Sequence, residues 1–242
     1  MTAAANEFRV MTSGAFTAAY KALIPQLEKL TGKTVVTVTT SIGTGDTSIP
    51  NRLKRGEVAD IVIVADGVLQ QFIADGLVLA EGATTIARSM MGFAVRAGAP
   101  DPAVRSADDL RRALLAAKAI GYSASESGKY FTTEMVQRLG IADEVLPKSR
   151  LIGGGERVGT VIARGELDFG FQQISELLPV QGIAHITPLP PELQKVSNFT
   201  AGVGANSPDP ASARAAIALL ASAAAKKAIT DSGLEPVVNP QS

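Results

Sequence analysis

The most constraining feature of this sequence is a regular alternation of short apolar segments with longer amphipathic ones, punctuated by glycine. Residues 35–39 are all β-branched and residues 61–64 are entirely apolar, which indicates two strands. Residues 15–30 carry apolar side chains at helical spacing and are followed by Thr31-Gly32, a typical helix end. This alternation predicts βαβ units and therefore an α/β fold built on mainly parallel sheet.

The same pattern continues along the rest of the chain. Asp66 and Ser106 are the predicted N-caps of two helices, and Pro25 is predicted to kink or split the first helix. The further predicted strands are 8–11, 91–96, 120–123, 169–171, 182–186 and 196–203. The further predicted helices are 49–55, 68–75, 107–116, 130–139, 158–164 and 211–229.

Composition excludes several classes of function. The 242 residues suffice for one large domain or two small ones, and 23 basic residues balance 23 acidic ones. This balance argues against a nucleic-acid partner. Cysteine is absent, which excludes thiol catalysis and disulfides. The single histidine, His185, lies in a predicted strand, so we expect neither a histidine-rich metal site nor a histidine-based triad.

Four predicted loops follow strands and precede helices, where backbone N–H groups attract anions. The first contains Ser13 and Gly14, and the second, residues 41–47, contains Thr44 and Thr47. These four residues are candidate ligand-binding residues, although the first loop could also serve only to cap its helix.

The third loop, residues 123–129, is unusually dense in polar groups. Ser123, Ser125 and Ser127 offer three hydroxyls, while Glu126 and Lys129 add an acid and an amine. The three serines are candidate ligand-binding residues, and a solvated loop is the alternative.

The fourth loop, residues 153–157, is a run of three glycines followed by a glutamate and Arg157, which could grip a carboxylate with two hydrogen bonds. No Gly-Lys-Ser/Thr follows the glycines, so this loop is not a P-loop. A hinge is the alternative reading. Gln173, which follows the predicted strand 169–171, is a further candidate for hydrogen bonding to a ligand oxygen.

Several motifs together resemble the molybdate-binding family of periplasmic solute-binding proteins, a group that includes the related aconitate isomerases. Residues 53–66 resemble the family's helix, glycine, Ala-Asp, apolar strand and Ala-Asp pattern. Residues 161–170 and 127–130 resemble two later segments, in the same order and at similar spacing.

The resemblance implies a two-lobed, type II periplasmic-binding-protein-like fold with the ligand cleft between the lobes. Each lobe would be a mainly parallel sheet flanked by helices. Lobe one would comprise residues 1–92 and 197–242, and lobe two residues 93–196. The implied partners are a small anionic ligand and a membrane component of an ABC transporter. Residues 1–7 have no basic or apolar signal region, so either the protein is cytoplasmic or a signal peptide has been removed. The resemblance implies the second alternative and therefore the periplasm. No cofactor is implied.

The second loop departs from the family pattern. Gly45, Asp46 and Thr47 stand where the family has a serine pair before glycine. An ionised aspartate would repel a tetrahedral dianion, which favours an organic di- or tricarboxylate as the ligand.

Two functions remain open at this point. A binding protein that captures the anion for uptake needs only neutral donors and helix ends. An isomerase that shifts a proton on a tricarboxylate such as aconitate also needs an acid or base. For that reaction Lys129, Tyr130 and Glu126 are the candidate catalytic residues. A transcriptional effector domain is disfavoured because no helix-turn-helix segment is attached.

Overall fold

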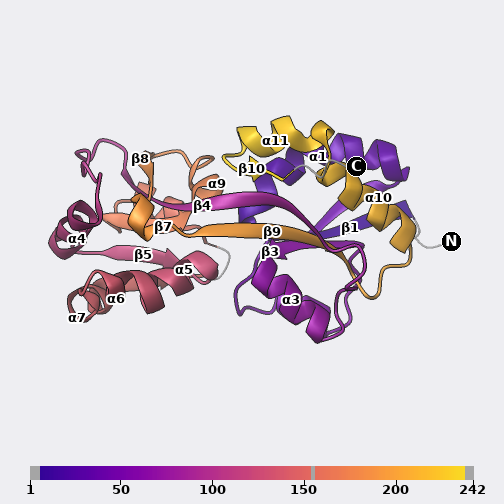
Figure 1. Ribbon diagram of the computed structural model, residues 1–242, viewed down its shortest axis with the longest axis horizontal. Coiled ribbons are helices and arrows are strands. Elements are labelled where there is room, and N and C mark those ends of the chain that lie inside the picture. Colours follow the sequence, from indigo (N-terminus) through magenta and orange to yellow (C-terminus); the bar gives the residue numbers. More distant parts are fainter. Residues whose placement is uncertain (1–5, 154–155, 238–242) are drawn as a thin grey trace. The chain divides into compact units, whose positions relative to one another are not determined.

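The computed structural model describes residues 6–153 and 156–237, which form two compact units. Unit 1 contains the described residues up to Ser89 together with those from Ser197 onward, and unit 2 runs from Met90 to Val196. The chain therefore passes from one unit to the other twice. The first passage lies within strand β4 (Thr84–Arg96) and the second at the start of β9 (Val196–Val203) (Figure 1).

Unit 1 is a mixed sheet covered by helices on its two faces. The strand order is β2, β1, β3, β9 and β4; β1 is parallel to β2 and β3, and β9 is antiparallel to β3. A short strand, β10, pairs with β4. The other strands are β1 (Glu7–Thr12), β2 (Thr34–Thr39), β3 (Ile61–Ala65) and β10 (Glu235–Pro236). The helices are α1 (Thr17–Thr31), α2 (Ile49–Lys54), α3 (Asp66–Ala74), α10 (Pro210–Leu220) and α11 (Lys226–Asp231).

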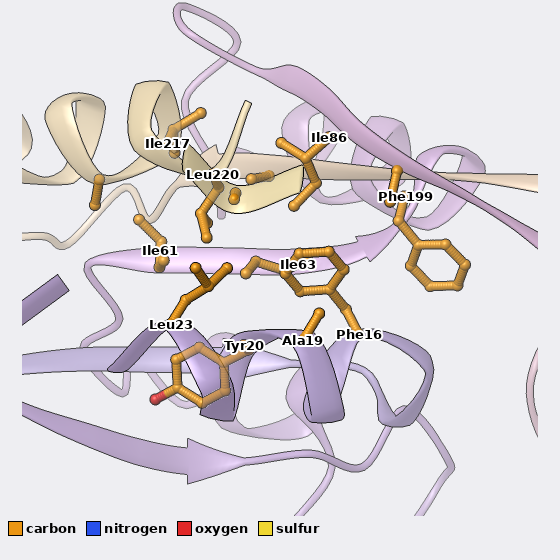
Figure 2. Close-up of a cluster of buried hydrophobic side chains, with 14 of the residues drawn as sticks. Phe16, Ala19, Tyr20, Leu23, Ile61, Ile63, Ile86, Phe199, Ile217 and Leu220 are labelled. Carbon is orange, nitrogen blue, oxygen red and sulfur yellow. The ribbon is translucent and has the colours of Figure 1, made fainter. Parts of the chain in front are cut away.

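The apolar run of β3 is explained by burial on both faces of the sheet. Side chains alternate along a strand, so Ile61 and Ile63 point to one face and Val62 and Val64 to the other. Figure 2 shows the two isoleucines among side chains from α1 and α10. The two valines pack in a second cluster with residues of α2 and α3. Full burial of each such side chain contributes about 1.5–3 kcal/mol.

Three predictions for unit 1 are wrong in detail. Of the two outcomes predicted for Pro25, a kink or a split, the split does not occur, because α1 is continuous through this exposed residue. Asp66 is the first residue of α3 rather than its cap, and its carboxylate accepts a hydrogen bond from Thr200. The predicted helix 211–229 is two helices, α10 and α11. They are separated near Ser222, whose hydroxyl accepts the N–H of Ala224 and starts a new 3-10 turn.

Unit 2 is a second mixed sheet with the order β8, β4, β7, β5 and β6. Strands β5, β6 and β7 are parallel, whereas β4 is antiparallel to β7 and β8. The strands are β5 (Ile120–Ser123), β6 (Ser149–Ile152), β7 (Phe169–Gln173) and β8 (Ile183–Pro188). The helices are α4 (Ala107–Ala116), α5 (Glu126–Tyr130), α6 (Val136–Arg138), α7 (Ala142–Val145), α8 (Val158–Ala163) and α9 (Ile174–Leu177).

Two apolar layers hold the helices of unit 2 on its sheet. On one face Phe131 stacks on Phe171 with ring centroids 4.9 Å apart, and Phe93 packs beside them. On the other face α8 lies very close to β7 at Gly170. A Cβ there would lie 2.4 Å from the nearest methyl group of Val158, so glycine is needed for this approach. This contact fixes where α8 begins, and therefore where Arg157 lies.

The predicted helix 130–139 begins earlier and is less regular than expected. Helix α5 starts at Glu126, so the loop after β5 contains only residues 124 and 125, and a π-helical turn, Phe131–Met135, separates α5 from α6. Ser106 caps α4 as predicted, accepting the N–H of Asp109. No helix among the described residues is long and apolar enough to cross a membrane.

Candidate functional site

The parallel strands β1, β2 and β3 of unit 1 end at one edge of the sheet, and the predicted residues of this unit lie there. Ser13 directly follows β1, and its backbone N–H donates to the carbonyl of Ile63 at 2.8 Å. Its side chain is buried, yet Oγ has no hydrogen-bond partner among the described residues. A buried hydroxyl without a partner is unusual in a folded protein, which makes Ser13 the strongest ligand-binding candidate in unit 1.

The loop of residues 41–47 is held by its backbone rather than by its side chains. Asn51 donates to the carbonyl of Thr44 at 3.0 Å, and Arg52 donates to that of Thr47 at 3.0 Å. Thr39, at the end of β2, donates to the same Thr47 carbonyl at 2.8 Å. The side chains of Thr44, Asp46 and Thr47 remain exposed.

Ser48 is a residue of this edge that the sequence analysis missed. It is fully buried just before α2, and its Oγ makes no side-chain cap and no other hydrogen bond within the described chain. The signal was present, because a serine before Ile49-Pro50 is a typical helix start. Ser13 and Ser48 are thus two buried hydroxyls of unit 1 with unused hydrogen-bonding capacity.

The predicted residues of unit 2 follow the carboxyl ends of β5, β6 and β7. In the parallel register Ser123 lies opposite Ile152, and Tyr122 lies opposite Phe171. The three strand ends are therefore level, and Ser123, Arg157 and Gln173 emerge from the same edge.

The three serines of the loop after β5 form a cluster. Ser123 Oγ lies 2.7 Å from Ser125 Oγ and 3.2 Å from Ser127 Oγ, and the latter two are 3.1 Å apart. The cluster depends on Gly128, because a Cβ at that position would lie 1.7 Å from the carbonyl oxygen of Ser123. Close contact between α5 and the end of β5 thus brings the three hydroxyls together.

The candidate catalytic residues of α5 differ in their surroundings. The side chain of Lys129 is exposed, and Glu126 is half-buried in the first turn of the helix. Tyr130 is buried, and its hydroxyl donates to the carbonyl of Leu193 at 2.7 Å. Its ring also lies beneath the ammonium of Lys195. The structure therefore gives Tyr130 a packing role that occupies its hydroxyl.

Arg157 has an acidic neighbour that the sequence analysis did not single out. Arg157 immediately precedes α8, and the positive charge of its guanidinium favours the ionised form of Glu176 in α9. Burial raises the pKa of Glu176 to about 7, against the opposing effects of Arg157, the side-chain amide of Gln172 and the backbone N–H of Gln173. A glutamate three residues after the N-cap residue, here Gln173, often accepts a hydrogen bond from the N-cap backbone N–H, so the sequence carried only a weak signal for Glu176.

Two more buried polar atoms lie in the same short segment. Gln172 Oε1 and Ser175 Oγ have no hydrogen-bond partner in the described part of unit 2, and Gln173 is buried beside them. The junction of β7 and α9 therefore combines a carboxyl of raised pKa with unsatisfied polar groups. Gly153 is exposed, and Gly154 and Gly155, which precede Arg157 in the predicted loop, lie outside the described residues.

His185 and a pocket beside Arg96 are two further polar features of unit 2. His185 is in β8, with Nδ1 3.8 Å from a carboxylate oxygen of Asp101. A pocket of about 700 Å³ is lined by Arg96, Lys118 and Asp168 at the opposite edge of the unit 2 sheet, where β5 and β7 begin, and none of the predicted site residues lines it. No group of three or more histidine, aspartate or glutamate side chains in the described ranges could hold a metal ion.

A family model described as bacterial extracellular solute-binding protein matches residues 8–235. The chain belongs to this family of solute-binding proteins. A relative found by sequence comparison is an aconitate isomerase from a Pseudomonas species. It is 37% identical over 229 residues, which cover 94% of this chain and 87% of that protein.

Solved structures support the fold of this family member. The periplasmic molybdate-binding protein of Azotobacter vinelandii aligns with a TM-score of 0.77 at 18% identity, covering 97% of this chain and 100% of the other. A sulfate-binding protein of Mycobacterium tuberculosis aligns with a TM-score of 0.75 at 19% identity, covering 98% and 88%. The predicted family and the predicted type II periplasmic-binding-protein fold are confirmed.

Proposed function

We propose that this protein is an isomerase that shifts a proton within an unsaturated tricarboxylate, as an aconitate isomerase does. The observation that carries the proposal is the 37% identity to such an enzyme over 94% of the chain. The solved anion-binding neighbours are less than 20% identical and support the fold alone.

The chemistry of the candidate residues suits a carboxylate ligand. Arg157 can donate two parallel hydrogen bonds to a carboxylate, and the clustered hydroxyls of Ser123, Ser125 and Ser127 can donate others. Ser13 of unit 1 adds a buried hydroxyl with unused capacity. These groups, with Gly14, Thr44, Thr47 and Gln173, are the ones we expect to contact the ligand.

Solute capture is the second candidate function. It is favoured by the family description and by the likeness to a periplasmic molybdate-binding protein. In this case the protein would deliver a small organic anion to an ABC transporter without changing it. Under either function we propose a periplasmic location.

Turnover in deuterated water distinguishes the two functions. Purified protein would be incubated with trans-aconitate and followed by proton NMR. An isomerase is expected to produce cis-aconitate and to exchange substrate hydrogen for deuterium. Binding of aconitate without product or exchange would establish solute capture instead.

Arg157→Ala tests the proposed carboxylate clamp. Losing a charge-assisted hydrogen bond costs about 1.5–3 kcal/mol, so we expect the affinity for aconitate to fall about tenfold or more in titration calorimetry. Arg150→Ala is the matched control, because Arg150 is an exposed arginine of the same unit that pairs with Glu166. Equal affinities for the two variants would remove Arg157 from the ligand site.

A further inference from the structure

We propose that Glu176 is the catalytic residue that carries the proton between two carbon atoms of the substrate. This inference rests on the proposed isomerase function and names the group that performs it. The residue was not among the sequence-based candidates, and its role follows from its place at the junction of β7 and α9.

The position of Glu176 is set by two packed elements. Gly170 faces α8, since a Cβ there would meet side chains of Val158 and Ile162. Side chains alternate along β7, so Gln172 points to the same face, toward the start of α8 at Arg157. Glu176, in the first turn of α9, hydrogen-bonds with the side chain of Gln172 and is acted on electrostatically by Arg157.

The surroundings of Glu176 have unused hydrogen-bonding capacity. Gln172 is 4% exposed and Ser175 is 1% exposed, yet Gln172 Oε1 and Ser175 Oγ have no partner within residues 6–153 and 156–237. Buried polar atoms are normally paired, and unpaired ones point to a functional site. Glu176 itself is half-buried: part of the side chain remains accessible, and desolvation of the carboxyl raises its pKa.

The protonation of Glu176 suits a group that both accepts and donates a proton. Burial raises its pKa to about 7, near the value at which a group serves equally as acid and base. Strands β7 and β8 and helix α8 pack against α9. Among the described residues of these three elements, His185 is the titratable one, and it lies beside Asp101 rather than Glu176. Arg157, which immediately precedes α8, carries a positive charge that favours the ionised form of Glu176.

The earlier candidates are less suited to this step. The hydroxyl of Tyr130 is occupied by the carbonyl of Leu193, and the amine of Lys129 is exposed. Glu126, half-buried in the first turn of α5, remains as the alternative carboxylate.

The reaction needs only one proton carrier. Ionised Glu176 accepts a proton from the methylene carbon of trans-aconitate, and the electron pair of the broken C–H bond forms a new C=C bond. The electron pair of the original C=C bond then takes a proton from the Glu176 carboxylic acid at the former vinyl carbon, and exchange of that carboxyl proton with solvent before this step introduces deuterium into the product. No electrons are gained or lost overall. Arg157 stabilises the negative charge that develops on the adjacent substrate carboxylate.

Glu176→Gln is the decisive variant, because the amide keeps the shape and the acceptor for the Gln173 N–H but cannot carry the proton. We expect its turnover of trans-aconitate to fall by about 10²–10⁴-fold. Its affinity for propane-1,2,3-tricarboxylate, a saturated analogue that cannot isomerise, should change by no more than about threefold. Glu166→Gln, at an exposed ion pair of the same unit, is the control expected to retain activity.

The pH profile provides a readout that a purely structural role would not move. In the wild-type protein kcat/KM should fall as the pH drops below about 7, because the protonated carboxyl cannot act as a base. Glu176→Asp should retain part of the activity and a similar profile, and circular dichroism would verify the fold of each variant.

Three results would overturn the inference. Turnover within about tenfold of wild type in folded Glu176→Gln would exclude the residue as the proton carrier. Abolished turnover in Glu126→Gln with an unchanged Glu176→Gln would assign the role to Glu126. Absence of turnover and of deuterium exchange in the wild-type protein would refute the isomerase function itself, and this inference with it.

Discussion

Gly128→Ala tests whether close approach of α5 to β5 builds the serine cluster. The added Cβ would lie 1.7 Å from the carbonyl oxygen of Ser123 and 2.8 Å from its carbonyl carbon. Both are backbone atoms that no side-chain rotation can move, so the first turn of α5 must shift. Overpacking that neighbours can relieve costs about 1–3 kcal/mol, and we expect a loss of about 3 kcal/mol in the free energy of unfolding.

The shift should also separate the hydroxyls of Ser127 and Ser123, which are 3.2 Å apart. Urea unfolding followed by far-ultraviolet circular dichroism measures the stability, and titration calorimetry with aconitate measures the ligand affinity. Gly67→Ala in α3 is the control, because nothing lies within 4 Å of its Cβ and alanine in a helix is favoured by up to about 1 kcal/mol. A Gly128→Ala protein with wild-type stability and wild-type affinity would refute this reasoning.

Two further variants test a ligand contact and an ion pair. Ser13→Ala removes a hydroxyl that has no partner within the described chain, so the melting temperature of the protein should not change. The affinity for aconitate, measured by calorimetry, should fall about three- to tenfold. An unchanged affinity would place Ser13 outside the ligand site. Asp209→Asn removes a carboxylate whose pKa the Lys33 ammonium and Ser212 hold well below its usual range, and should cost about 1 kcal/mol at pH 7. A lowered pKa stabilises the folded protein only at pH values above the pKa of the aspartate in the unfolded chain. The difference in the free energy of unfolding between wild type and Asp209→Asn should therefore shrink as the pH falls below about 4. A difference that stays constant with pH in urea unfolding would contradict this expectation.

The fold was largely predictable because its strongest elements bury apolar residues at regular spacing. The continuous run of β3 and the capped helix α4 are examples. Strand β6 was missed because it is an edge strand in which Arg150 and Leu151 are exposed and only Ile152 is buried. The break between α10 and α11 was missed because an alanine-rich stretch carries little signal apart from Ser222.

Site residues could be predicted from the sequence only where they directly follow a parallel strand. Loops after parallel strands meet at one edge, so Ser123, Arg157 and Gln173 could be assigned to one edge from the sequence. Glu176 could not be assigned, because its raised pKa depends on burial between α8, β7 and β8 rather than on any local motif. Nor does sequence reveal that the hydroxyl of Tyr130 is taken by a backbone carbonyl 63 residues away.

The discontinuity of unit 1 has a consequence for how the chain folds as it is synthesised. Strand β3 needs β9 as its second neighbour, and the core around Ile61 and Ile63 includes Phe199, Ile217 and Leu220. Strand β9 and helix α10, which carry these residues, leave the ribosome only after the whole of unit 2 has been synthesised. Unit 2 can therefore pair its own strands before unit 1 is complete. Until then β3 presents an open, fully apolar edge that could pair with other nascent chains. We therefore expect the oldest part of the growing polypeptide, rather than the newest, to depend most on chaperones.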